Sequence, residues 1–179
     1  MPRVRLYAAM SLDGYIADAG GGTDWLAGYD ARKYGFDAFL GEVGAVVMGR
    51  RTFEQVTTFD ESWPYAGKRA IVMTSRRLAR LPAGAAIERG GIAPAVEGAR
   101  QATSGDVWIV GGAMAMRTAL EAQLVDRIDL TMIPVVLGGG IPLLGEMRGR
   151  HRLSFENVEI HKDSVVRLTY LVERAAPPG

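Results

Sequence analysis

Two segments of this 179-residue chain have the residue pattern of a phosphate-binding turn. In the first, Val107–Ala115, a short apolar run leads into Gly111 and Gly112, and a helical pattern starts directly afterwards. The unpaired N–H groups and the positive dipole end of a helix start attract an anion, and glycine lets a ligand approach the main chain closely. Taken alone, such a segment is more often a tight turn with nothing bound.

The second segment, Ala45–Phe53, repeats this arrangement and adds two positive charges. Gly49 follows an apolar run, and Arg50 and Arg51 open the helical pattern behind it. Guanidinium groups form bidentate hydrogen bonds with phosphate oxygens, so this turn strengthens the phosphate hypothesis.

A third polar turn, Met73–Arg77, also follows a strand-like run. In a parallel sheet all three turns lie at the carboxyl ends of strands, the edge where open α/β sheets bind ligands. One extended ligand with several phosphates can therefore touch all of them. Neither glycine turn has the three spaced glycines of the dinucleotide-binding fingerprint, which disfavours a Rossmann domain.

Composition narrows the remaining chemistry. The chain has no cysteine, and its histidines are His151 and His161, so thiolate chemistry is excluded and we expect no metal site. A formal net charge of +1, from 21 basic and 20 acidic side chains, gives no long-range attraction to nucleic acid or membrane surfaces. No segment approaches the ~20 apolar residues of a spanning helix, and the charged N-terminus does not suit a secretory signal. We therefore expect a cytoplasmic protein.

The elements that position these turns alternate between strand and helix. Strand-like apolar runs occur at Val4–Met10, Ala45–Met48, Arg69–Met73, Val107–Val110 and Arg127–Val136. Helical patterns lie between them, such as the apolar stripe from Ala113 to Leu124. This alternation predicts an α/β fold in which a mostly parallel central sheet has helices on both faces.

The end of the chain has a different pattern. Two strand-like segments, 155–160 and 165–172, are separated only by His161–Ser164, which predicts a C-terminal antiparallel hairpin. With 179 residues, 48% of them hydrophobic, the chain fits one domain. We assign that domain to residues 1–174 and a flexible tail to residues 175–179.

Four motifs, taken in order, resemble the dihydrofolate reductase fold, a three-layer α/β architecture. They are Ser11–Ala17, Met48–Glu54, Ile71–Arg76 and Ile109–Ala113. Pro134–Leu143 is similar to the riboflavin-biosynthesis reductase branch, whose members reduce a phosphoribosylamino-pyrimidine with NADPH. Members of that branch often carry a basic residue where this chain has Tyr15, and many are fused to a zinc deaminase whose cysteine ligands are absent here.

The resemblance implies NADPH as the cofactor and assigns residues to it. Those on the pyrophosphate and adenosine side are Gly49, Arg50, Arg51, Thr52, Gly111, Gly112, Ala113 and Met114. Those lining the nicotinamide are Ala9, Ile16 and Ala17, and core packing is the main alternative for Ala9 and Ile16. Ser75 and Arg76 would lie beside the adenine ribose. Together with Arg50 they predict NADPH over NADH, because a guanidinium and a hydroxyl suit the 2′-phosphate. For Arg76 the alternative is an ordinary solvated charge.

The catalytic candidates are Trp25, Asp30 and Asp13. Trp25 follows a glycine-rich segment, residues 18–24, that suits a mobile loop closing over a cofactor. Asp30 follows Trp25 by five positions, the spacing of the pterin-binding carboxylate in dihydrofolate reductases, although Asp30 could instead cap a helix. Asp13 is a further carboxylate candidate that could equally stabilise a turn.

We therefore expect an NADPH-dependent reductase that transfers hydride to a small heterocyclic substrate, with 5-amino-6-(5-phosphoribosylamino)uracil as the first candidate. The alternatives are a dihydrofolate reductase-type pterin reductase and an NADPH-binding sensor without catalysis. The family often forms dimers and the apolar segment 135–144 suits an interface, so we expect a homodimer that binds a small molecule and neither nucleic acid nor membrane.

Overall fold

The centre of the fold is an eight-stranded sheet in the order β5-β4-β3-β6-β1-β7-β10-β9. The structure is a computed structural model that describes residues 1–58 and 62–174, so the predicted tail at 175–179 lies outside the described residues. The strands are β1 (Val4–Ser11), β2 (Tyr15–Ala17), β3 (Val43–Gly49), β4 (Arg69–Met73), β5 (Ala85–Glu88), β6 (Asp106–Gly111), β7 (Arg127–Ile133), β8 (Ile141–Pro142), β9 (Leu153–Ile160) and β10 (Val166–Val172). From β5 to β7 neighbouring strands are parallel, and β10 pairs antiparallel with both β7 and β9.

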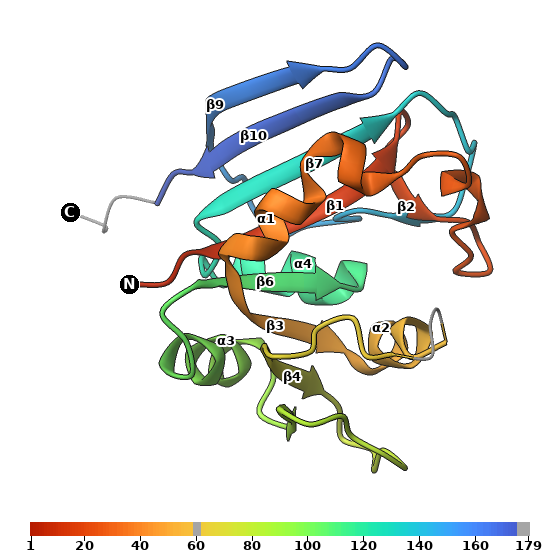
Figure 1. Ribbon diagram of the computed structural model, residues 1–179. Coiled ribbons are helices and arrows are strands. Elements are labelled where there is room, and N and C mark those ends of the chain that lie inside the picture. The colour runs from red at the N-terminus through yellow and green to blue at the C-terminus, as the bar shows by residue number, and fades with distance from the viewer. Residues whose placement is uncertain (59–61, 175–179) are drawn as a thin grey trace.

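Helices cover both faces of this sheet (Figure 1). They are the 3₁₀ helices η1 (Asp24–Leu26) and η2 (Ala31–Tyr34) and the α-helices α1 (Phe36–Glu42), α2 (Arg50–Val56), α3 (Ile92–Gln101) and α4 (Ala113–Glu121). One core packs α3 and α4 against Leu6, and the other packs α1 and α2 against Tyr7. Because successive strand residues point to opposite faces, β1 contributes to both cores, which gives the three layers predicted from the sequence.

Strand register brings three turns to one edge of the sheet. On β3, Gly49 is opposite Met73 of β4, and Met48 is opposite Gly111 of β6. The turns that follow β3, β4 and β6 therefore begin at the same level. The parallel strands β1 and β7 complete this edge on the other side of β6.

The predicted parallel sheet and C-terminal hairpin are confirmed, with differences at the margins. β7 ends at Ile133 rather than Val136, because Pro134 has no N–H to donate to a neighbouring strand. The sequence analysis missed β2 and β8, which form a short antiparallel pair, and β5, whose residues are all half-buried and lack an apolar run. These short strands depend on tertiary partners rather than on a local pattern.

Candidate functional site

The two glycine turns touch one another at the edge of the sheet. A Cβ added to Gly49 would lie 3.9 Å from the carbonyl oxygen of Gly111 and from the nitrogen of Gly112, and one added to Gly111 would lie 3.6 Å from Thr52 Oγ1. A cis peptide bond joins Gly111 to Gly112. The predicted phosphate turns after β3 and β6 therefore form one continuous backbone surface.

The third turn extends this surface beyond β4. Ser75 and Arg76 are exposed there, and the Arg76 amide donates to Thr74 Oγ1 at 3.0 Å, which fixes the turn. In the described part of the chain, the Arg76 guanidinium has no ion-pair partner. Arg50 instead pairs with Glu54, Nη1 to Oε1 at 2.5 Å, in an exposed contact within α2. We call residues 49–52, 74–76 and 111–114 the glycine edge.

Helix α4 begins at this edge with small and exposed side chains. Ala113 is half-buried, and the Met114 side chain is 70% exposed although it is large and apolar. The amides of Ala115 and Met116 already donate to the carbonyl of Gly112, whereas the preceding amides lie in the first turn, where a helix leaves its N–H groups unpaired. The start of α4 can therefore accept an anion.

The three residues predicted to line the nicotinamide lie in β1 and β2. Ala9 is half-buried and opposite Thr131 of β7. Ile16 packs partly against the core beneath α4, and Ala17 is buried in the strand β2. The structure therefore gives Ile16 a packing role and leaves Ala9 facing a pocket.

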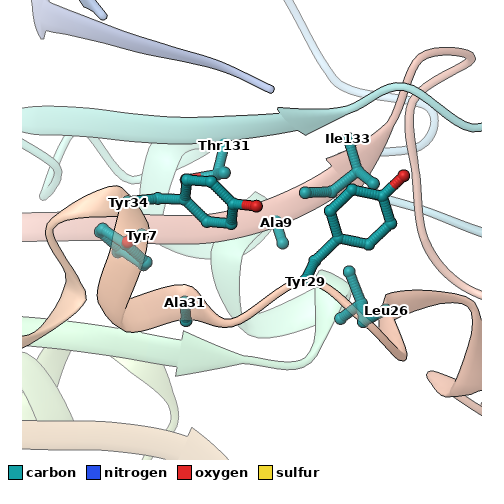
Figure 2. A pocket seen from close by; sticks show the side chains of 8 residues that line it. All are labelled: Tyr7, Ala9, Leu26, Tyr29, Ala31, Tyr34, Thr131 and Ile133. Carbon is teal, nitrogen blue, oxygen red and sulfur yellow. The ribbon is translucent and has the colours of Figure 1, made fainter. Parts of the chain in front are cut away.

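That pocket is lined by side chains without formal charge (Figure 2). The lining residues are Tyr7, Ala9, Leu26, Tyr29, Ala31, Tyr34, Thr131 and Ile133. We call this the tyrosine pocket. Its floor is the face of β1 and β7, and its cover is the segment from η1 to η2. Thr131 Oγ1 is buried without a hydrogen-bond partner among the described residues, so a ligand in the pocket could satisfy it.

Tyr34 is fixed in the wall of this pocket by the distant C-terminal hairpin. Its hydroxyl donates a short hydrogen bond to Asp163 Oδ2, and its ring meets the edge of His161 at a centroid distance of 5.0 Å. The hydrogen bond to Asp163 raises the pKa of Tyr34 to about 12 and lowers the pKa of Asp163. The turn between β9 and β10 therefore contributes to the site.

Tyr7 is held by aromatic rings and by a cation. Its ring stacks on Phe39 at a centroid distance of 4.2 Å and meets the edge of Trp108 at 6.2 Å. The Arg167 guanidinium carbon lies 5.7 Å from the Tyr7 ring centroid. Burial raises the pKa of the Tyr7 hydroxyl above its ordinary value of 10.0. Tyr7 is therefore a rigid phenol that stays protonated at neutral pH.

None of the three predicted catalytic residues is among the described residues that line the tyrosine pocket. Asp30 is exposed and caps η2, accepting from the Arg32 amide at 3.1 Å. Asp13 accepts from Ser11 Oγ at 2.7 Å and from the Leu137 and Gly138 amides at 3.1 and 2.7 Å, and these bonds lower its pKa.

Trp25, the third of these residues, packs in a cluster with Tyr34 and Ile133. Its indole Nε1 is buried and has no partner among the described residues.

The structure reveals pocket residues that the sequence analysis did not single out, namely Tyr7, Tyr29, Tyr34 and Thr131. Only the position of Tyr7, two residues before Ala9 on the same face of β1, carried a usable signal. Among the described residues, no three histidine, aspartate or glutamate side chains are placed to hold a metal ion. None of the described helices has the length and apolar character needed to cross a bilayer.

Comparison with known proteins places this chain among reductase domains. Residues 2–166 match the family described as the RibD C-terminal domain. The uncharacterized protein YwjB of Bacillus subtilis is 31% identical over 155 residues, which cover 86% of this chain and 89% of YwjB. A putative riboflavin biosynthesis protein from Shewanella sp. PV-4 is 30% identical, with a TM-score of 0.80, over 96% of this chain and 99% of that chain.

Two less similar structures identify the fold. A diaminohydroxyphosphoribosylaminopyrimidine deaminase/5-amino-6-(5-phosphoribosylamino)uracil reductase from Thermotoga maritima is 17% identical, with a TM-score of 0.72, over 96% of this chain and 56% of that chain. Dihydrofolate reductase from Enterococcus faecalis, complexed with NADP(H), is 17% identical, with a TM-score of 0.69, over 96% and 97%. The predicted dihydrofolate reductase-like fold and the similarity to riboflavin-biosynthesis reductases are therefore confirmed.

Proposed function

Because the chain belongs to the RibD C-terminal domain family, a reductase-type family of riboflavin biosynthesis, we propose that it is an NADPH-dependent reductase of a small heterocyclic substrate. The first candidate substrate is 5-amino-6-(5-phosphoribosylamino)uracil. The observation that carries the proposal is the meeting of three strand-end turns at the glycine edge, next to the tyrosine pocket. A dinucleotide at that edge could extend its reactive ring toward Ala9 at the mouth of the pocket.

The glycine edge fits the phosphate-bearing part of such a cofactor. Gly49, Gly111 and Gly112 leave the backbone open, and the start of α4 offers N–H groups to an anion. When bound, NADPH would supply a hydride to the substrate. The residues of this chain would bind it, orient it and exclude water from the pocket.

Arg76 and Ser75 are proposed to select NADPH over NADH. A 2′-phosphate would form charge-assisted hydrogen bonds with the Arg76 guanidinium, which has no ion pair in the described part of the chain. Arg76→Ala should therefore weaken NADPH binding by about 1 to 3 kcal/mol and leave NADH binding unchanged, as measured by calorimetry. Arg80→Ala, which removes another exposed cation of the same loop, is the control. Equal losses for both nucleotides would contradict the 2′-phosphate role.

The uncharged lining of the tyrosine pocket favours a uracil-type substrate over a pterin. A pterin that is protonated on reduction is best matched by a carboxylate, whereas the described pocket lining offers hydroxyl groups instead. Loss of NADPH absorbance, followed with each substrate in turn, separates the two. Turnover of dihydrofolate but not of the pyrimidine would move the assignment to a pterin reductase, in which Asp30 remains the predicted partner. Tight NADPH binding without any turnover would instead indicate a sensor.

We further propose that the protein is a homodimer. Val136 of the predicted interface segment is 66% exposed, and β9, an edge strand, exposes Phe155 by 60% and Ile160 by 77%. Exposed apolar groups of this kind mark contact surfaces. Sedimentation of the wild type and of the double variant Phe155→Glu, Ile160→Glu checks this proposal. A monomeric wild type would overturn it.

A further inference from the structure

The proposed reduction needs a proton as well as a hydride. The described residues that line the pocket limit the side chains that can donate that proton. Reduction of a C=N or C=O bond leaves its nitrogen or oxygen one proton short. The residues lining the tyrosine pocket that carry an exchangeable side-chain proton are Tyr7, Tyr29, Tyr34 and Thr131. The threonine hydroxyl is far too weak an acid for this step, so the tyrosines remain.

The nearby carboxylates are engaged elsewhere. Asp13 accepts three hydrogen bonds that tie the loop after β1 to the loop after β7. Asp30 is exposed and caps η2, and Asp18 accepts from the Gly20 and Gly22 amides in its own loop. None of them lines the pocket, and Asp13, with a lowered pKa, holds no proton at neutral pH.

Tyr34 and Tyr29 are poorer donors than Tyr7. The Tyr34 proton is already donated to Asp163, so giving it up would leave two negative oxygens in contact. Tyr29 lies on the opposite side of the pocket from Tyr7, and its hydroxyl points away from Tyr7 (Figure 2). By contrast, no hydrogen bond ties the Tyr7 hydroxyl to a carboxylate in the described part of the chain, and its polar neighbour in the pocket is the neutral hydroxyl of Thr131, so the Tyr7 proton is available to a ligand.

The surroundings of Tyr7 also suit the anion that a proton donor leaves behind. Arg167, 12% exposed, lies over the Tyr7 ring and places a positive charge beside it. That charge is shared with Asp129 at 3.4 Å and Glu159 at 3.3 Å, so it holds the phenolate without making Tyr7 a strong acid. Ala9 lies two residues after Tyr7 and on the same face of β1. The phenol is therefore next to the position predicted for the nicotinamide, farther from the carboxyl end of the strand.

We infer that Tyr7 is the catalytic proton donor of the proposed reduction, and this inference rests on the proposed function. As the substrate carbon gains a hydride from reduced nicotinamide dinucleotide, the π-electron pair of the double bond moves onto the nitrogen or oxygen. That atom takes the proton from the Tyr7 hydroxyl. The resulting tyrosinate beside Arg167 regains a proton from water, so atoms and charge balance over one cycle.

The test replaces Tyr7 by phenylalanine, which keeps the ring and removes the proton. Single-turnover oxidation of NADPH with 5-amino-6-(5-phosphoribosylamino)uracil should slow about 100-fold or more in Tyr7→Phe. Tyr170→Phe is the matched control and should stay within about threefold of the wild type, because Tyr170 lies in β10 opposite Ile128 and is not among the described residues that line the pocket. Calorimetry of the non-reacting complex with NADP⁺ should give the same substrate dissociation constant for Tyr7→Phe and wild type.

The possible outcomes separate this inference from the proposed function. If wild type turns over and Tyr7→Phe keeps its rate, the Tyr7 inference is wrong and the reductase stands. A Tyr7→Phe variant that loses substrate binding but not the single-turnover rate would likewise show a binding role only. If the single-turnover rate falls in Asp30→Asn but not in Tyr7→Phe, the Tyr7 inference is wrong and Asp30 becomes the candidate proton donor. If the wild type binds NADPH and reduces nothing, both proposals fall together.

Discussion

The glycine edge and the tyrosine pocket lie side by side on one sheet, yet they are built in opposite ways. The glycine edge consists of local turns in which the glycines lie at the ends of their strands, and Arg51 and Arg76 there are exposed. The tyrosine pocket combines side chains from β1, the η1–η2 segment and β7, and its wall is fixed by the β9–β10 turn. An edge made of backbone suits a ligand common to many enzymes, whereas a pocket made of distant side chains can be changed for each substrate.

Charge follows the same division. Beneath the tyrosine pocket, Arg5 is 2% exposed and Asp129 is fully buried, and the guanidinium donates to the carboxylate from Nε at 3.1 Å and from Nη2 at 2.8 Å. Arg127, Arg167 and Thr169 also reach Asp129. At the glycine edge the recorded ion pair is the exposed contact of Arg50 with Glu54. Charge pairing should therefore stabilise the fold on the pocket side and contribute little at the edge.

The largest effect is expected from breaking the buried pair. Asp129→Asn removes the buried carboxylate that Arg5 shares with Arg127 and Arg167, although Arg5 keeps its ion pairs with Glu42 and Asp106, and it should lower the free energy of unfolding by about 3 to 5 kcal/mol. Glu54→Gln, the control at the glycine edge, removes one partner of an exposed pair and should cost less than about 1 kcal/mol. Urea denaturation of both variants measures the difference. Similar losses for the two would show that the regions do not differ in how charge supports them.

A smaller effect is expected from adding a methyl group to Gly49 of the glycine edge or to Gly140 of the loop between β7 and β8. A Cβ at Gly140 would collide with the Ala17 carbonyl oxygen, and its backbone has a φ of +143°, so Gly140→Ala should cost about 1 to 3 kcal/mol of stability. A Cβ at Gly49 would meet its neighbours at an ordinary 3.9 Å, so Gly49→Ala should fold normally. It should instead weaken NADPH binding, because the methyl group occupies space that the ligand needs.

Thermal unfolding of both variants measures the expected loss of stability in Gly140→Ala, and titration with NADPH measures the expected loss of binding in Gly49→Ala. Gly139→Ala is the control for Gly140→Ala, because it lies in the same loop between β7 and β8 and its added Cβ would meet open space. If Gly49→Ala binds NADPH as tightly as the wild type, the glycine is only a turn residue. The phosphate assignment of the edge would then lose its support.

This difference in construction also explains what could be predicted from the sequence. Gly49, Gly111 and Gly112 come directly after apolar strand residues and directly before a helix. The pattern that predicts the turn is therefore contained within a few consecutive residues. The parallel sheet and the antiparallel hairpin follow from the same local periodicity. What the sequence does not give is which strands pair and in which register, and this pairing brings the turns together in the structure.

The tyrosine pocket could not be predicted in this way. Tyr34 and Asp163 are separated by 129 positions, and nothing in the sequence around either residue indicates the other. Asp30 and Asp13 illustrate the reverse difficulty, because a carboxylate near a motif has the same appearance whether it serves catalysis or caps a turn. In the structure both accept hydrogen bonds from backbone amides. Only the three-dimensional contacts separate the two roles.

The smallest effect concerns the hydrogen bond between Tyr34 and Asp163. The bond lowers the pKa of Asp163 below its ordinary value of 3.8, so its contribution to stability is present above that pH and is lost as the pH falls through the folded pKa. Asp163→Asn should therefore lower the urea midpoint near neutral pH, and the difference from wild type should shrink well below pH 3.8. Lys162→Ala, an exposed change in the same turn, should show no such convergence. A constant difference across this range would mean that the hairpin turn packs against Tyr34 without depending on the Asp163 charge.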